Sequence, residues 1–122
     1  MNKAFEEWLD QSAPCDGALA CAVRCTNGAL VGRSWADGFT AASLENALRC
    51  VADLFQVIDH HRIAPGRVRW VFGNALFHCE RRRDGTCFGV FTVREQEVLD
   101  AEWLERLFVE YRAVGQPEIV AA

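Results

Sequence analysis

Cysteine and histidine are the side chains of this sequence that could act as a nucleophile, a base or a metal ligand. Six cysteines and three histidines are spread over 122 residues. The closest cysteine pairs, Cys15 with Cys21 and Cys21 with Cys25, are separated by five and three residues, whereas zinc sites favour pairs separated by two. Cys21 and Cys25 also share one face of an alternating apolar stretch with Leu19 and Val23. We interpret these two as small core side chains, expect reduced thiols, and expect no metal site.

A catalytic cysteine or histidine needs a partner on the same side of the structure. His78 and Cys79 are neighbours in an expected strand and therefore point to opposite faces. Cys87, across the next turn, could face either of them. His60 and His61 end a helical pattern, where a protonated imidazole complements the helix dipole. We expect no enzyme, and keep as one alternative a profilin-like ligand-sensing domain that uses Cys79 or Cys87.

Charge and glycine patterns exclude two further kinds of ligand. No glycine-rich loop between a strand and a helix is present to hold phosphate, so no cofactor is expected. The net charge of -4 and the pI near 5.3 disfavour nucleic-acid binding. The run Arg81-Arg82-Arg83 is flanked by Glu80 and Asp84, which is typical of a solvated turn. We expect all three arginines to face water.

Length and composition predict one globular domain. Hydrophobic residues make up 51% of the chain and charged residues 25%, which is too apolar for intrinsic disorder. No run of about 18 apolar residues is present, and the acidic N-terminus does not resemble a signal peptide. We expect a cytoplasmic protein without a membrane partner, with a domain over residues 1–114 and a tail over 115–122.

Periodicity and turn residues divide the chain into eight elements. Apolar residues recur with helical spacing in three segments and alternate in five, and turn signals such as Thr26-Asn27-Gly28 and Asp84-Gly85 separate them. The predicted helices cover residues 2–11, 41–60 and 98–113, and the predicted strands cover residues 17–25, 29–36, 67–72, 75–81 and 86–93. The fold class is therefore α+β, with the order α-β-β-α-β-β-β-α and a five-stranded antiparallel sheet in two or three layers.

Several apolar and aromatic residues exceed what the core of one subunit needs. The apolar sector of the central helix is widened by Leu54 and Val57, which suggests a second neighbour. The first strand after that helix places Trp70 on one face and Arg67 and Arg69 on the other; if it is an edge strand, it could pair with its own copy, or its arginines could guard the edge. Together with the tryptophan that ends the second strand, the candidate interface residues are Trp35, Leu54, Val57, Arg67, Arg69 and Trp70.

The pattern resembles the roadblock/LC7 family, whose members share a profilin-like or longin-like sheet. The likeness runs from about Phe5 to Val114 and is carried by the strand Gly17-Ala-Leu-Ala-Cys-Ala-Val-Arg, by the turn and strand Thr26-Asn-Gly-Ala-Leu-Val-Gly-Arg-Ser, and by a long central helix ending near Ile58. Two departures are a shorter polar gap before the central helix and an unusually acidic and aromatic last helix.

The resemblance implies a non-enzymatic homodimer or heterodimer. Its central helices and the strands after them would pack across a two-fold axis and form one continuous sheet. Such proteins regulate small Ras-like GTPases or serve as scaffold subunits of larger assemblies. A secretion-type chaperone that holds an effector segment is the other alternative, but its usual order places three strands before the central helix, whereas the turn signals here place two.

Overall fold

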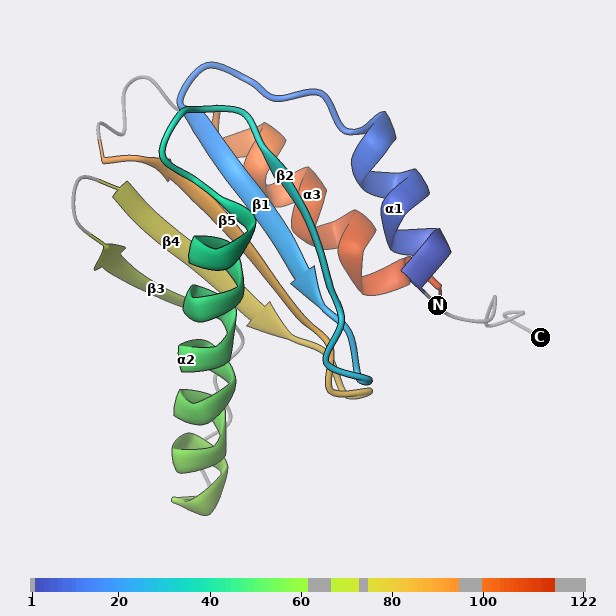
Figure 1. Cartoon of the computed structure of the whole chain (residues 1–122), viewed down its shortest axis with the longest axis vertical. Helices are drawn as coiled ribbons and strands as arrows, with labels where there is room; N and C mark the ends of the chain where they lie inside the picture. The colour runs from blue at the N-terminus through green and yellow to red at the C-terminus, as the bar shows by residue number, and fades with distance from the viewer. Residues whose placement is uncertain (1, 62–66, 73–74, 95–99, 116–122) are drawn as a thin grey trace.

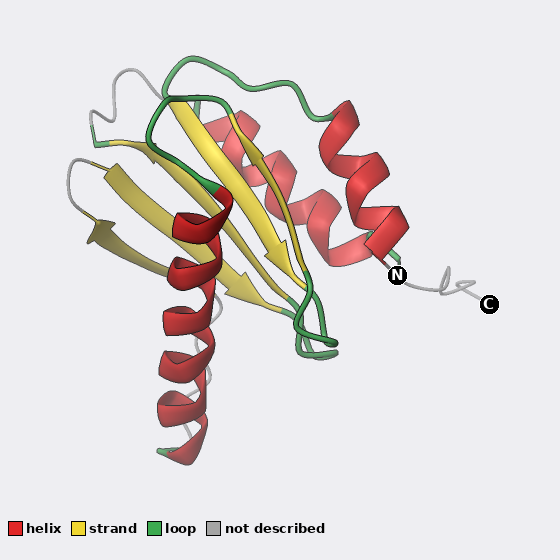
Figure 2. Cartoon of the chain, viewed as in Figure 1, coloured by secondary structure: helices red, strands yellow, loops and turns green. Residues whose placement is uncertain are grey.

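Within residues 2–61, 67–72, 75–94 and 100–115, which the computed structural model describes, three helices and five strands follow the predicted order. They are α1 (Asn2–Gln11), β1 (Ala18–Arg24), β2 (Leu30–Ser34), α2 (Ala41–His60), β3 (Arg67–Phe72), β4 (Ala75–Arg81), β5 (Cys87–Val93) and α3 (Ala101–Ala113). The α+β class with a five-stranded antiparallel sheet is confirmed (Figure 1, Figure 2). Apart from Gly115, the predicted tail lies outside the described residues.

Side-chain caps define where the two longer helices begin. Thr40 has an extended backbone, and its Oγ1 accepts a hydrogen bond of 3.1 Å from the N–H of Ser43, so α2 begins at Ala41 as predicted. In the same way, Asp100 accepts hydrogen bonds of 3.0 and 3.1 Å from the second and third N–H groups of α3. The described part of this helix therefore begins at Ala101 rather than at Val98, and residues 95–99 lie outside the described residues.

The strands lie in the order β2-β1-β5-β4-β3, and each neighbouring pair is antiparallel. The hairpin β1–β2 and the meander β3–β4–β5 follow the predicted turns, where Gly28 and Gly85 have φ values of 85° and 93°. Pairing of β1 with β5 joins the hairpin to the meander. As a result β1 and β5 lie inside the sheet, while β2 and β3 form its edges in the described part of the chain.

A bulge in β1 corrects one predicted side-chain direction. Ala18 pairs with Thr92 whereas Ala20 pairs with Phe91, so the β1 strand has one residue more than its partner between these pairs. Leu19 consequently packs on the α2 side of the sheet and not with Cys21, as the alternation had predicted. The extra residue shifts the alternation of side chains by one position, and nothing in the local sequence indicates the bulge.

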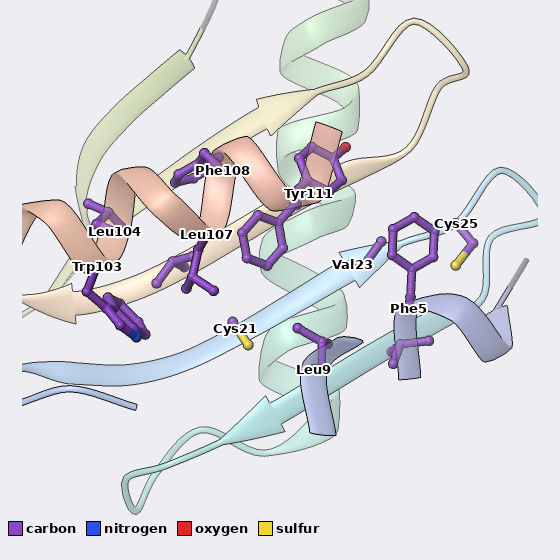
Figure 3. Close-up of a cluster of buried hydrophobic side chains, with 13 residues drawn as sticks. Phe5, Leu9, Cys21, Val23, Cys25, Trp103, Leu104, Leu107, Phe108 and Tyr111 are labelled. Carbon is purple, nitrogen blue, oxygen red and sulfur yellow. The ribbon is translucent and has the colours of Figure 1, made fainter. Parts of the chain in front are cut away.

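The sheet is covered on both faces, so the molecule has three layers. One face packs against α2 through small and aromatic side chains, among them Ala20, Ala22, Leu48, Phe77 and Phe91. The other face packs against α1 and α3; Figure 3 shows Phe5 and Leu9 of α1 and Leu107 and Tyr111 of α3 directed toward Cys21 and Val23. Both clusters are fully desolvated, as expected for a domain of this size.

The cysteines contribute to these clusters as thiols. All six are free; Cys21 and Cys25 are buried as predicted, and Cys79 and Cys87 are buried as well. Cys50 is exposed on α2. None of the described helices is both long enough and apolar enough to cross a membrane.

Candidate protein-binding surface

Two of the predicted interface residues lie on one flank of α2. The side chains of Leu54 and Val57 are 38% and 56% exposed, although the inner face of the same helix is fully buried. Asp59, on the opposite flank, binds Arg81 at the end of β4 with distances of 2.5 and 2.6 Å. Leu54 and Val57 therefore lie on the flank opposite to Asp59, in the C-terminal half of α2, which projects beyond the strands (Figure 1).

Exposed apolar side chains occur on both sides of the sheet. Among the described residues the large hydrophobic side chains that remain exposed are Leu54, Val57, Val71 and Val109. Two of these lie on α2 and one on β3, the edge strand. We refer to Leu54, Val57 and the free edge of β3 as the α2–β3 surface. An exposed apolar helix flank and an unpaired strand edge are each typical of a contact with another chain.

Arg67, a third predicted residue, is occupied within its own subunit. Its guanidinium forms two hydrogen bonds of 2.7 and 3.0 Å with Glu105 of α3 and lies 4.0 Å from the centre of the Phe108 ring. The hydrogen bonds from Arg67 also lower the pKa of the Glu105 carboxyl. Arg67 thus attaches the edge strand β3 to α3.

The other residues predicted on β3 are placed by its backbone. Arg69 is exposed at the centre of the strand and takes part in none of the ion pairs found among the described residues. Trp70 follows it on the opposite face of the strand, and its side chain lies outside the described part of the structure. Arg69 is therefore the charged side chain that a partner strand at this edge would meet.

Trp35 does not join the α2–β3 surface. It follows β2, at the other edge of the sheet, and its ring packs edge-on against Trp103 of α3 at 5.9 Å between centroids. An intramolecular contact, which the sequence alone did not reveal, thus covers part of the Trp35 ring. Leu54 and Val57 lie on α2, Arg67 and Arg69 lie on β3 on the sheet face that α3 covers, and Trp35 follows β2 at the other edge.

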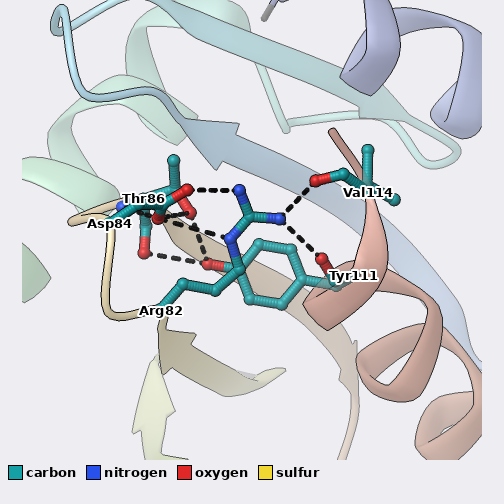
Figure 4. Close-up of polar contacts among 5 residues, drawn as sticks. All are labelled: Arg82, Asp84, Thr86, Tyr111 and Val114. Carbon is teal, nitrogen blue, oxygen red and sulfur yellow. Dashed lines mark hydrogen bonds and ion pairs between the residues drawn. The ribbon is translucent and has the colours of Figure 1, made fainter. Parts of the chain in front are cut away.

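Arg82 corrects the prediction that the Arg81–Arg83 turn is solvated. Its side chain is 6% exposed, and its guanidinium donates hydrogen bonds of 2.9 and 2.5 Å to the main-chain oxygens of Tyr111 and Val114. On its other side it pairs with Asp84, and these hydrogen bonds hold the pKa of that carboxyl well below its usual range (Figure 4). Arg82 thereby donates to carbonyl groups at the C-terminal end of α3, where intrahelical hydrogen bonds run out.

The same site is extended by a buried tyrosine. The hydroxyl of Tyr111 donates to the carbonyl oxygen of Thr86 at 2.8 Å and lies 3.0 Å from the Thr86 hydroxyl. Burial raises the pKa of Tyr111 well above its usual range, so the phenol stays protonated. Its bonds, like those of Arg82, connect α3 to the β4–β5 turn.

A second buried charge was also missed by sequence reasoning. Glu80 is 6% exposed and receives hydrogen bonds of 2.6 and 2.7 Å from Arg112 of α3. The Nε atom of Arg67, 4.0 Å from Glu80, is buried without a hydrogen-bond partner among the described residues. Glu80 had been taken only as a flank of a polar turn, whereas its even position in β4 places it on the face that α3 covers.

The histidine and cysteine candidates do not assemble into a nucleophile and a base. His78 contacts the hydroxyl of Thr92 at 3.0 Å, and burial lowers the pKa of the imidazole to about 4. Cys79 and Cys87 belong to the α2 side, and burial raises the pKa of both thiols. Because a reactive cysteine requires a lowered pKa, this geometry does not favour the thiol-dependent alternative.

No group of three histidine, cysteine, aspartate or glutamate side chains in the described part of the chain is placed to hold a metal ion. A scan against models of known protein families gives no match for this chain, and no curated protein sequence matches it. The α2–β3 surface is therefore inferred from the structure and not from a related protein.

Proposed function

We propose that this protein is a non-enzymatic dimeric adaptor or regulator of the roadblock/LC7 kind. In this proposal a second copy of the chain packs on the α2–β3 surface, and the dimer binds a small Ras-like GTPase or a larger protein assembly. The observations that carry the proposal are the exposed Leu54–Val57 flank of α2 and the position of β3 at the edge of the described sheet.

The arrangement of the strands supports the same proposal. Two strands precede the long helix and three follow it, as the resemblance to the roadblock/LC7 family implies and unlike the order of secretion-type chaperones. Because β3 is an edge strand, pairing with its own copy would satisfy its free backbone groups and bury the apolar flank of both α2 helices. A two-fold interface of this kind uses the same patch on both subunits.

The molar mass in solution tests the dimer. We expect the wild type, measured by light scattering at micromolar concentration under reducing conditions, to have twice the chain mass of 13.7 kDa. Val57→Glu places one unpaired charge from each subunit in the interface. At roughly 1–3 kcal/mol for each buried group left without a partner, the dimer dissociation constant should rise at least about 30-fold.

Val109→Glu is the matched control, because Val109 on α3 is also 56% exposed but lies outside the α2–β3 surface. We expect this variant to keep the dimer. A monomeric wild type, or equal dissociation by both substitutions, would contradict the proposed interface.

The adaptor role is tested separately with purified Ras-like GTPases of the same organism, loaded with GDP or with a non-hydrolysable GTP analogue. Calorimetric titration should show binding of at least one of them to the wild type and not to the chain carrying Val57→Glu, because the partner is expected to recognise the dimer. Absence of binding in both nucleotide states would leave the fold and the dimer intact and remove the GTPase from the proposal.

A further inference from the structure

The second edge of the sheet, β2, borders a groove that the proposed dimer does not use. This groove has a volume of about 310 Å³ and is lined by the β2 strand itself, by Phe39, Ala41 and Leu44 on one side, and by Glu6 of α1 on the other. It is therefore a groove that runs along a free strand edge between two helices. Since β2 and β3 are at opposite ends of the strand order, both edges can be occupied at once.

The hairpin register determines which backbone groups face this groove. The N–H of Trp35 donates to the oxygen of Leu19, and the N–H of Cys25 donates to the oxygen of Ala29, each at 2.8 Å. Backbone groups of an antiparallel strand alternate in direction, so the odd-numbered residues of β2 face β1. The even-numbered residues, 30, 32 and 34, direct their N–H and C=O groups into the groove.

One of these groups is already bound within the chain. Nη1 of Arg33 donates to the oxygen of Gly32 at 2.7 Å, and the same guanidinium binds Asp10 of α1 at 2.6 and 2.9 Å. This contact protects the centre of the edge, as charged side chains commonly do on edge strands. No hydrogen bond to another described residue is found for the N–H groups of the three even-numbered residues or for the carbonyls of Leu30 and Ser34.

The two walls of the groove differ in chemistry. On the α2 side Leu30 and Phe39 are half-buried and Leu44 is buried, which makes this wall apolar. The α1 side holds the guanidinium of Arg33, whose charge is paired with Asp10, and the exposed carboxylate of Glu6, which takes part in none of the ion pairs of the described residues. An added strand presents successive side chains to opposite faces, so alternate residues of a ligand would meet the apolar and the acidic wall.

We propose that the β2 groove binds an extended segment of a partner protein by strand addition, and that this segment alternates apolar residues with lysine or arginine. Main-chain hydrogen bonds to residues 30, 32 and 34 hold the segment. The apolar side chains pack on Phe39 and Leu44, and a basic side chain pairs with Glu6. The proposal does not depend on the dimer at the α2–β3 surface.

Binding of synthetic peptides tests the proposal directly. The probe is a fluorescent eight-residue peptide that alternates valine and lysine, with blocked ends, measured by anisotropy. Two reference peptides are used: one with the same residues arranged as four valines followed by four lysines, and one that alternates valine and glutamate. We expect saturable binding of the alternating basic peptide and at least about tenfold weaker binding of both references. Equal binding of the three, or none, would overturn the proposal.

Two pairs of variants locate the site. Ser34→Pro removes an edge N–H and places a ring on the edge, whereas Ser34→Ala keeps the N–H; only the proline variant should lose binding. Glu6→Lys should weaken binding at least about tenfold, whereas Glu7→Lys, an exposed neighbour on α1 outside the groove, should change it less than about threefold. Equal effects within either pair would overturn the assignment. Circular dichroism and urea midpoints confirm that each variant is folded.

Amide exchange measured by NMR gives a readout independent of the variants. A saturating peptide should slow exchange at residues 30, 32 and 34, and protection at β3 instead would overturn the assignment. If the chain carrying Ser34→Pro has a different oligomeric mass in solution from that of the wild type, a second copy occupies the β2 edge and the peptide proposal is wrong. Peptide binding by the chain carrying Val57→Glu should be unchanged, which separates failure of this inference from failure of the dimer.

Discussion

Arg82→Ala removes a guanidinium that connects the β4–β5 turn to the end of α3. Two charge-assisted hydrogen bonds, to the carbonyl oxygens of Tyr111 and Val114, are lost. Each is worth roughly 1.5 kcal/mol or more, and contact of the cation with the rings of Phe5 and Tyr111, both 5.2 Å away, adds roughly 0.5 kcal/mol. The main-chain oxygen of Tyr111 keeps one donor in this variant, because it also accepts a hydrogen bond from the N–H of Val114.

The expected loss in the free energy of unfolding is therefore about 3.5 kcal/mol, a large part of the 5–15 kcal/mol typical of a domain. Urea unfolding followed by circular dichroism measures it, and an unchanged m-value would show that the comparison is between the same two states. Arg82→Lys should fall between the wild type and Arg82→Ala, because an ammonium is a point donor without the planar fork that bridges two carbonyls and a carboxylate.

Arg83→Ala is the matched control. Arg83 is the next residue of the same turn and is exposed, so its removal should change the free energy of unfolding by less than about 0.5 kcal/mol. If Arg82→Ala and Arg83→Ala have the same effect, the buried guanidinium does not stabilise the end of α3 and the reasoning is refuted.

Three further predictions concern the core. Gly89→Ala should lower the free energy of unfolding by about 1–3 kcal/mol, because the added Cβ would lie 2.3 Å from the Phe77 ring. Gly32→Ala should lower it by less, because the added Cβ would lie 3.1 Å from the flexible end of the Leu44 side chain. Urea unfolding compares the two variants. The free energy of unfolding should fall by up to about 3 kcal/mol as pH drops from 6.5 to 4, since unfolded His78 takes up a proton that the folded state, with its pKa near 4, does not; His78→Gln should flatten this slope, and an unchanged slope would contradict it. Thiol titration with Ellman's reagent should show Cys50 reacting first and the four buried thiols only on unfolding; fast reaction of a buried thiol would refute the packing.

The elements of the fold could be predicted from sequence because their signals are local. Strand alternation, the helical stripe of α2 and the turn residues Gly28 and Gly85 each act within a few residues. The pairing of β1 with β5 could not be predicted, because it joins residues about 70 positions apart and no local pattern specifies it. The bulge at Leu19 escaped prediction for the same reason: it is visible only against the partner strand.

The candidate surface was predictable only where a local pattern exposes it. Leu54 and Val57 widen an apolar stripe beyond what one neighbour covers, and this excess is readable in the sequence. Arg82 is not distinguishable from Arg83 by composition, since its burial depends on where the last turn of α3 arrives, about 30 residues later. The prediction for Trp35 erred in the opposite direction: it was expected to be an exposed contact, but its ring packs against Trp103 of α3.

The two strand edges suggest how binding could be divided in this molecule. At roughly 4.8 Å between neighbouring strands, β2 and β3 are separated by about 19 Å of sheet, which is too far for one ligand side chain to contact both. The β3 edge carries an exposed arginine, and the flank of α2 that holds Leu54 and Val57 is apolar and exposed, which suits burial against an identical surface. The β2 edge borders an acidic helix on one side and an apolar wall on the other, which suits a segment of different sequence. A dimer formed through β3 would leave its two β2 grooves at the far ends of the joined sheet, where each remains open to a partner.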